Sequence, residues 1–145
     1  MKYKIILTLL IFTFSSSSFS LPSRLSEYIS SHPSWKSSDS AAFSFITNRC
    51  GLLYTVISER YKNMKDASDI YNNAVQQALV FVVASKETFE KNGGTTKAFQ
   101  DRAAKWAKIY GEEAVKNIDI NGEMLSGELK EDVTTCSAIV LPALK

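Results

Sequence analysis

The sequence contains few of the residues that most often carry chemistry. It has one histidine, His32, and two cysteines, Cys50 and Cys136. No C-x-x-C or H-x-x-x-H spacing is present, so a zinc site has no pair of ligands from which to start. A cysteine nucleophile usually needs a base beside it, and His32 lies well before Cys50, in a different segment. We therefore expect no catalytic residues, no metal site and no cofactor, and a thiol enzyme is the least favoured class.

Long apolar runs are scarce as well. The uncharged run at residues 5–14 has about half the length needed to cross a bilayer. Lys2 and Lys4 precede it, and a serine-rich stretch follows, with small residues at the minus-three and minus-one positions of a cut after Ser20. This layout is typical of a secretory signal peptide. We expect residues 1–20 to be removed and the product to be exported to the periplasm or beyond, without stable membrane insertion.

Neither sign of charge is in excess in the expected mature chain. The whole sequence has seventeen Lys and Arg against fifteen Asp and Glu, and removing Lys2 and Lys4 leaves fifteen of each. Nucleic acid and anionic lipid surfaces need clustered basic side chains, which a neutral chain of interspersed signs does not offer. Nucleic acid is therefore excluded as a partner. A protein partner or a small apolar ligand remains.

The apolar residues that are present recur at steps of three and four, which is the spacing of helices with one buried stripe. The expected helices span about 41–61, 68–92, 96–118 and 126–141. Ser40 and Ser126 are the expected N-caps of the first and last helices, and the segment 118–123 is expected to be a loop because of its Asn-Gly pair. The predicted fold is all-α, a small four-helix bundle formed by residues 41–145.

The two cysteines lie on the apolar stripes of the first and last expected helices. These helices are neighbours in an up-down-up-down bundle, and axes about 8–10 Å apart permit the Cα separation of about 5.5 Å that a disulfide requires. An exported protein reaches a compartment in which the bond persists. We therefore predict a Cys50–Cys136 disulfide. Gly51 is consistent with it, because a missing side chain lets a neighbouring helix approach closely.

Residues 21–40 form a serine-rich arm ahead of the predicted bundle. Its aromatic residues Tyr28 and Trp35 are the candidate contacts for a partner, although docking of Trp35 onto the helical domain is the favoured alternative. A short helical turn is expected between Ser23 and Ser30.

Two function classes follow from these features. The first is a non-catalytic exported binding protein, such as an inhibitor, a chaperone-like protein or an adaptor module. The second is a carrier that holds a small apolar ligand in a cavity between helices. The candidate lining residues of that cavity are Phe81, Trp106, Tyr110 and Ile139.

Overall fold

A computed structural model of the protein describes residues 23–141, and the expected signal peptide at residues 1–20 lies outside the described residues. Over the described range all regular secondary structure is helical, which confirms the all-α prediction. The elements are α1 (Leu25–Ser31), α2 (Ser40–Tyr61), a 3-10 turn (Lys65–Ala67), α3 (Ser68–Lys91), α4 (Thr96–Asn121) and α5 (Gly127–Ser137).

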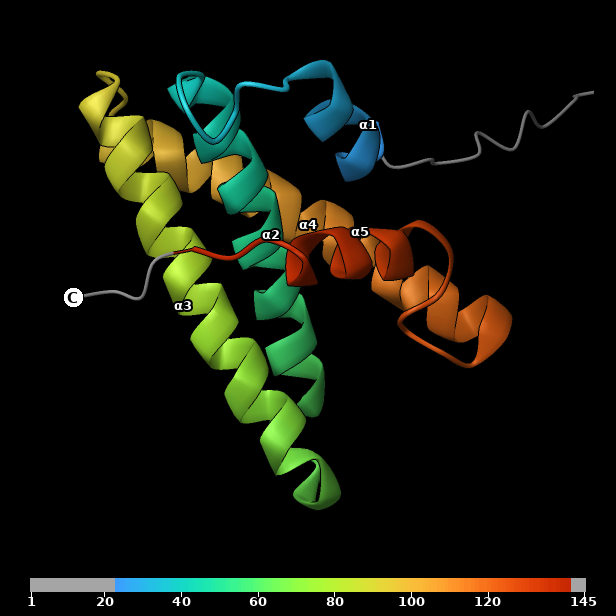
Figure 1. Ribbon diagram of the computed structural model, residues 1–145. Helices are drawn as coiled ribbons and strands as arrows, with labels where there is room; N and C mark the ends of the chain where they lie inside the picture. The colour runs from blue at the N-terminus through green and yellow to red at the C-terminus, as the bar shows by residue number, and fades with distance from the viewer. Residues whose placement is uncertain (1–22, 142–145) are drawn as a thin grey trace, which may run out of the picture.

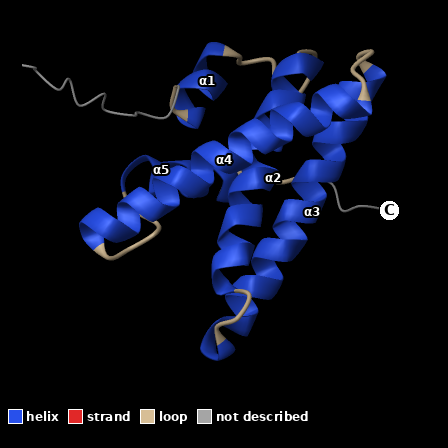
Figure 2. Cartoon of the chain, turned by 180° about the vertical axis from the view of Figure 1, so that it is seen from behind, coloured by secondary structure: helices blue, strands red, loops and turns tan. Residues whose placement is uncertain are grey.

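The helices are arranged around one long hairpin. α2 and α3 run antiparallel and pack side by side, and α4 crosses this hairpin (Figures 1 and 2). The short helices α1 and α5 contact each other and α2, and the segment after α5 returns across α3 (Figure 1). The structure therefore does not confirm a bundle of four helices. Five α-helices occupy residues 23–141, because the serine-rich segment contributes a helix of its own.

The segment that precedes α2 belongs to the hydrophobic core. Leu25 and Trp35 are both buried, and Trp35 stacks on Phe43 of α2 with the ring centroids 6.0 Å apart. The N-cap of α2 is Asp39, whose carboxylate accepts a hydrogen bond of 2.9 Å from the backbone N–H of Ala42. The prediction of Ser40 as the cap was wrong by one residue, since aspartate supplies the same acceptor one position earlier.

Two later helix ends also differ from the prediction. α4 continues through the expected loop at 118–123 and ends at Asn121, because Gly122 with φ of 73° is the residue that can adopt the left-handed conformation. The last helix was expected to reach about residue 141, but α5 ends at Ser137, and Val140 beyond it is exposed. Ser126 does precede α5, but its side chain makes no capping hydrogen bond.

α2 and α3 pack closely at Gly51. A Cβ atom added at Gly51 would lie 2.7 Å from Cγ2 of Val82 and 3.0 Å from its backbone nitrogen. The expected close approach of a neighbouring helix at this glycine is thus present. Gly111 in the middle of α4 is different, because a Cβ atom there would meet nothing within 4 Å.

These two glycines form a matched pair for a stability test. Gly51→Ala is expected to lower the free energy of unfolding by about 1–3 kcal/mol, because the α3 backbone must move away. Gly111→Ala is expected to raise it by about 0.5–1 kcal/mol, because alanine loses less conformational entropy in a helix. Urea denaturation of both variants measures the difference, and equal effects of the two substitutions would contradict the close approach at Gly51.

Candidate functional site

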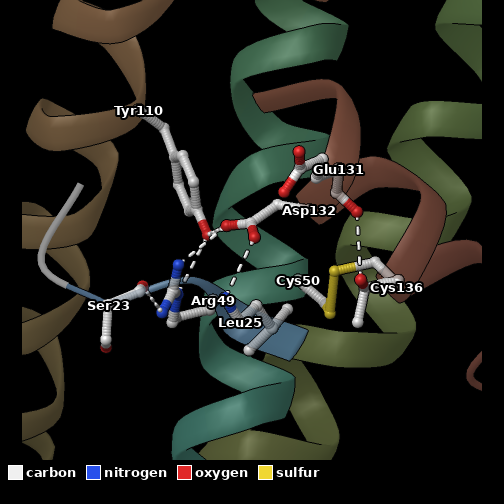
Figure 3. A network of polar contacts seen from close by, with 9 residues as sticks. Ser23, Leu25, Arg49, Cys50, Tyr110, Glu131, Asp132 and Cys136 are labelled. Carbon is white, nitrogen blue, oxygen red and sulfur yellow. Dashed lines mark hydrogen bonds and ion pairs between the residues drawn. A yellow bond between two sulfur atoms is a disulfide. The ribbon is translucent and has the colours of Figure 1, made fainter. Parts of the chain in front are cut away.

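A buried ion pair lies at the centre of the molecule. Arg49 of α2 and Asp132 of α5 are both buried, and Nη2 of the arginine lies 2.7 Å from Oδ2 of the aspartate (Figure 3). Tyr110 of α4 completes the contact, since its hydroxyl donates to the same carboxylate oxygen at 2.7 Å and accepts from Nε of Arg49 at 3.0 Å. Burial raises the pKa of the Tyr110 hydroxyl above its usual range, so it remains a donor.

The same charges also hold the first described residues of the chain. Nη1 of Arg49 donates to the backbone carbonyl of Ser23 at 3.0 Å, and the backbone N–H of Leu25 donates to Oδ1 of Asp132 at 3.2 Å (Figure 3). The guanidinium carbon of Arg49 lies 4.3 Å from the ring centroid of Trp106. The ion pair therefore connects α2, α4, α5 and the start of α1. Its polar atoms bind other parts of this chain, which is the role of a structural contact.

The predicted disulfide is confirmed directly beside this ion pair. Cys50 and Cys136 are bonded, with their Cα atoms 5.5 Å apart (Figure 3). Neither sulfur is a free thiol in this structure. His32 stacks on Tyr28 with ring centroids 4.1 Å apart, and its Nδ1 lies 2.9 Å from the Tyr28 carbonyl oxygen. The histidine thus packs on its own helix, and the base that thiol chemistry would need is not placed beside either cysteine.

Sequence reasoning missed Arg49 and Asp132. A signal for them was present, because Arg49 directly precedes Cys50, and Asp132 lies one helical turn before Cys136. The disulfide holds the two cysteines together, so it also brings the neighbouring Arg49 of α2 and Asp132 of α5 close to each other. The residues three and four positions from Arg49 are apolar, so the arginine could have been recognised as a buried cation that needs a buried anion.

The structure separates the candidate binding residues into several environments. Tyr28 is half-buried and packs on Phe45 at 4.3 Å, and Trp35 is buried, so both contact this chain itself. Phe81 and Ile139 line one pocket of about 290 Å³ between α3 and the segment after α5. The other residues lining it are Gln77, Val80, Ser137, Val140 and Leu141. Trp106 and Tyr110 are not among them, because their rings pack on each other beside Arg49.

A second polar contact joins α2, α3 and α4. The Ser44 hydroxyl donates to the Ser85 carbonyl at 3.0 Å, and the Ser85 hydroxyl donates to the Ser44 carbonyl at 2.7 Å. Arg102 of α4 donates to the Ser44 hydroxyl at 2.8 Å, and its guanidinium lies 4.4 Å from the Phe89 ring centroid. Burial lowers the pKa of Arg102. This contact, too, is directed into the protein and stabilises the packing of three helices.

One surface feature is the side of α3 turned away from α2, and another is a hollow of about 530 Å³ on α4 whose lining includes Val115 and Ile120. No residue between Ile70 and Ser85 is charged, although 22% of the whole chain is. Leu79 is 57% exposed, and Val75 is exposed one turn before it. Ile70, near the end of the helix hairpin, is half exposed. We call the residues Asn72, Val75, Gln76, Leu79 and Val83 the α3 outer face.

Comparison of the chain with protein-family models, with curated proteins and with solved structures finds no match. Between residues 23 and 141, no helix combines the length and the apolar character that crossing a membrane requires. In that same part of the chain, no three His, Cys, Asp or Glu side chains are grouped as a metal site would need. We take the α3 outer face as the candidate functional site because Leu79 and Val75 are exposed within an uncharged stretch of helix.

Proposed function

We propose that the protein is an exported, non-catalytic binding module whose partner docks on the α3 outer face. The observation that carries this proposal is the exposed Leu79 and Val75 in the middle of an uncharged helix stretch. Contact surfaces are depleted of charge at their centre, and neighbouring exposed apolar side chains mark interaction sites. The α3 outer face has both properties.

The interior of the molecule supports a binding role over a catalytic one. Arg49, Asp132 and Tyr110 hydrogen-bond one another, and the two cysteines are bonded together. The contacts of these groups hold helices in place. A disulfide also suits an oxidising compartment, which supports export. The result is a rigid helical scaffold that presents α3 to its surroundings.

A binding experiment tests the proposal with one substitution and one matched control. Residues 21–145 are immobilised and exposed to proteins of the native compartment. Leu79→Glu is expected to weaken capture of a specific partner by roughly thirtyfold or more, since a central aliphatic contact is replaced by a charge. Val115→Glu is the control, because Val115 on α4 is exposed to a similar extent, 59%. Equal capture by both variants would contradict a role for α3.

The carrier remains a second candidate because of the pocket lined by Phe81 and Ile139. Its volume, about 290 Å³, is close to the lower end of ligand sites, so only a small apolar molecule fits. Stoichiometric uptake of 1-octanol that is abolished by filling the pocket with Val80→Trp would favour the carrier. Uptake that is unchanged by that substitution would remove this candidate.

A further inference from the structure

Six residues of α3 lie along its outer side at alternating steps of four and three. They are Asn72, Gln76, Leu79, Val83, Lys86 and Glu90. This is the spacing of the a and d positions of a coiled coil, whose side chains form one seam. All six are at least partly exposed, whereas Val82 of the same helix faces Gly51 of α2. We call these six residues the α3 seam. It extends the α3 outer face along the helix.

The α3 seam is complementary to a reversed copy of itself. If two α3 helices pair antiparallel about residue 81, Leu79 of each copy meets Val83 of the second copy. The aliphatic pairs then lie at the centre, where charge is absent. Toward the ends, Gln76 meets Lys86 of the second copy, and Asn72 meets Glu90 of the second copy. An amide oxygen can accept from the ammonium group, and an amide N–H can donate to the carboxylate.

Lys86 and Glu90, at the charged end of the seam, are positioned by contacts within the chain. Nζ of Lys86 lies 2.9 Å from a carboxylate oxygen of Glu90 within the chain, and the Thr96 hydroxyl donates to Glu90 at 2.7 Å. The hydrogen bond from Thr96, followed by that from Lys86, lowers the pKa of Glu90 and keeps it ionised. The ammonium group has three donors, and the carboxylate accepts several hydrogen bonds, so both have capacity for a second partner.

Parallel pairing of the same seam is disfavoured. It would set Lys86 against Lys86 and Glu90 against Glu90 of the second copy, and like charges in register repel each other. Antiparallel pairing avoids both contacts and also sets the two helix dipoles in opposite directions. The polar ends of the seam thus select one orientation, while the uncharged centre supplies the buried apolar contact.

We propose that the occupant of the α3 outer face is a second copy of this chain, paired antiparallel through the α3 seam in a two-fold symmetric dimer. The inference rests on the proposed binding role of this face and names its partner. In a two-fold symmetric dimer, the same surface of each subunit forms the contact. That surface must therefore be complementary to itself in the antiparallel orientation, as the α3 seam is.

Sedimentation velocity of the oxidised mature protein tests the dimer. Between about 1 and 200 µM, a range in which specific homodimers form, the sedimentation coefficient is expected to rise from the monomer to the dimer value. Leu79→Glu is expected to weaken dimerisation by roughly a thousandfold, because each dimer contains two copies of the substituted contact. Val115→Glu is expected to dimerise like the wild type. A wild-type protein that is monomeric throughout this range overturns the inference.

Cross-linking tests the orientation. Gln76→Cys and Lys86→Cys variants are mixed in an oxidising glutathione buffer, with mass spectrometry showing the native Cys50–Cys136 bond intact. A covalent dimer is expected from the mixture and not from either variant alone, because residue 76 meets residue 86 of the second copy. Dimers from each variant alone, or none from the mixture, would overturn the antiparallel seam.

The two proposals fail in distinguishable ways. If the wild type is monomeric but captures a different protein in a manner that depends on Leu79, the dimer is wrong and the binding role of α3 stands. If neither self-association nor capture responds to Leu79→Glu, both proposals are wrong.

Discussion

Replacing Asp132 by alanine is expected to lower the free energy of unfolding by about 3–5 kcal/mol, which is the usual cost of breaking a buried ion pair. The substitution leaves the guanidinium of Arg49 buried without its carboxylate, and Tyr110 can accept only one of its hydrogen bonds. It also removes the acceptor of the Leu25 backbone N–H, so the start of α1 loses its attachment. Urea denaturation followed by circular dichroism measures the loss.

Two controls separate the buried charge from other effects of substitution. Glu131→Ala removes the neighbouring carboxylate, which pairs with Arg24 at 3.3 Å with both side chains about half exposed, and should cost under about 1 kcal/mol. The double variant Arg49→Met with Asp132→Leu should be more stable than Asp132→Ala alone, because no unpaired charge remains. If Asp132→Ala were as mild as Glu131→Ala, the ion pair would not hold the helices together.

Removing the disulfide is expected to have the second large effect. In the variant with Cys50→Ala and Cys136→Ala, the free energy of unfolding should fall by about 2–5 kcal/mol, because the bond closes a loop with a sequence separation of 86. α5 is short and its chain neighbours are loops, so it should lose protection before the α2–α3 hairpin does. Hydrogen exchange resolves this order, and urea denaturation gives the total loss.

Reduction with dithiothreitol provides the control for the disulfide prediction. It should destabilise the wild type by a similar amount and leave the double alanine variant unchanged. Uniform loss of protection over all helices would contradict the attachment of α5 by this bond. We also expect the disulfide and Asp132→Ala effects to be non-additive, since Asp132 lies one turn from Cys136 and both attach α5 to α2.

The parts of the fold that follow from local patterns could be predicted. α3 ends before Gly93, and α4 begins at Thr96 after the N-cap Thr95, whose hydroxyl accepts from the backbone N–H of Ala98 at 3.2 Å. The stretch 79–83 is helical, as the expected helix of about 68–92 requires. Each of these outcomes depends on residues within one or two turns. The Cys50–Cys136 bond could also be predicted, because two cysteines allow only one pairing within the chain.

The parts that depend on distant residues could not be predicted. Leu25 stands among serines with no helical period, and only the neighbouring helices make its position part of the core, whereas the expected docking of Trp35 onto the helical domain is present. The candidate cavity residues were all apolar and periodic, but Phe81 and Ile139 meet at one pocket while Trp106 and Tyr110 pack on Arg49. The helical spacing of apolar residues shows which side of a helix is buried. It does not show which other helix packs against that side.

The sequence by itself determined that the chain is helical, which two cysteines are bonded, and that α3 has an apolar stripe. Only the tertiary structure decided that Arg49 and Asp132 are buried together, that α1 belongs to the core, and that the Leu79 side of α3 faces outward. The physical reason is that helix formation and capping depend on neighbours along the chain, whereas burial depends on which segments cover one another. Here α2 covers one side of α3 at Gly51 and leaves the other side exposed.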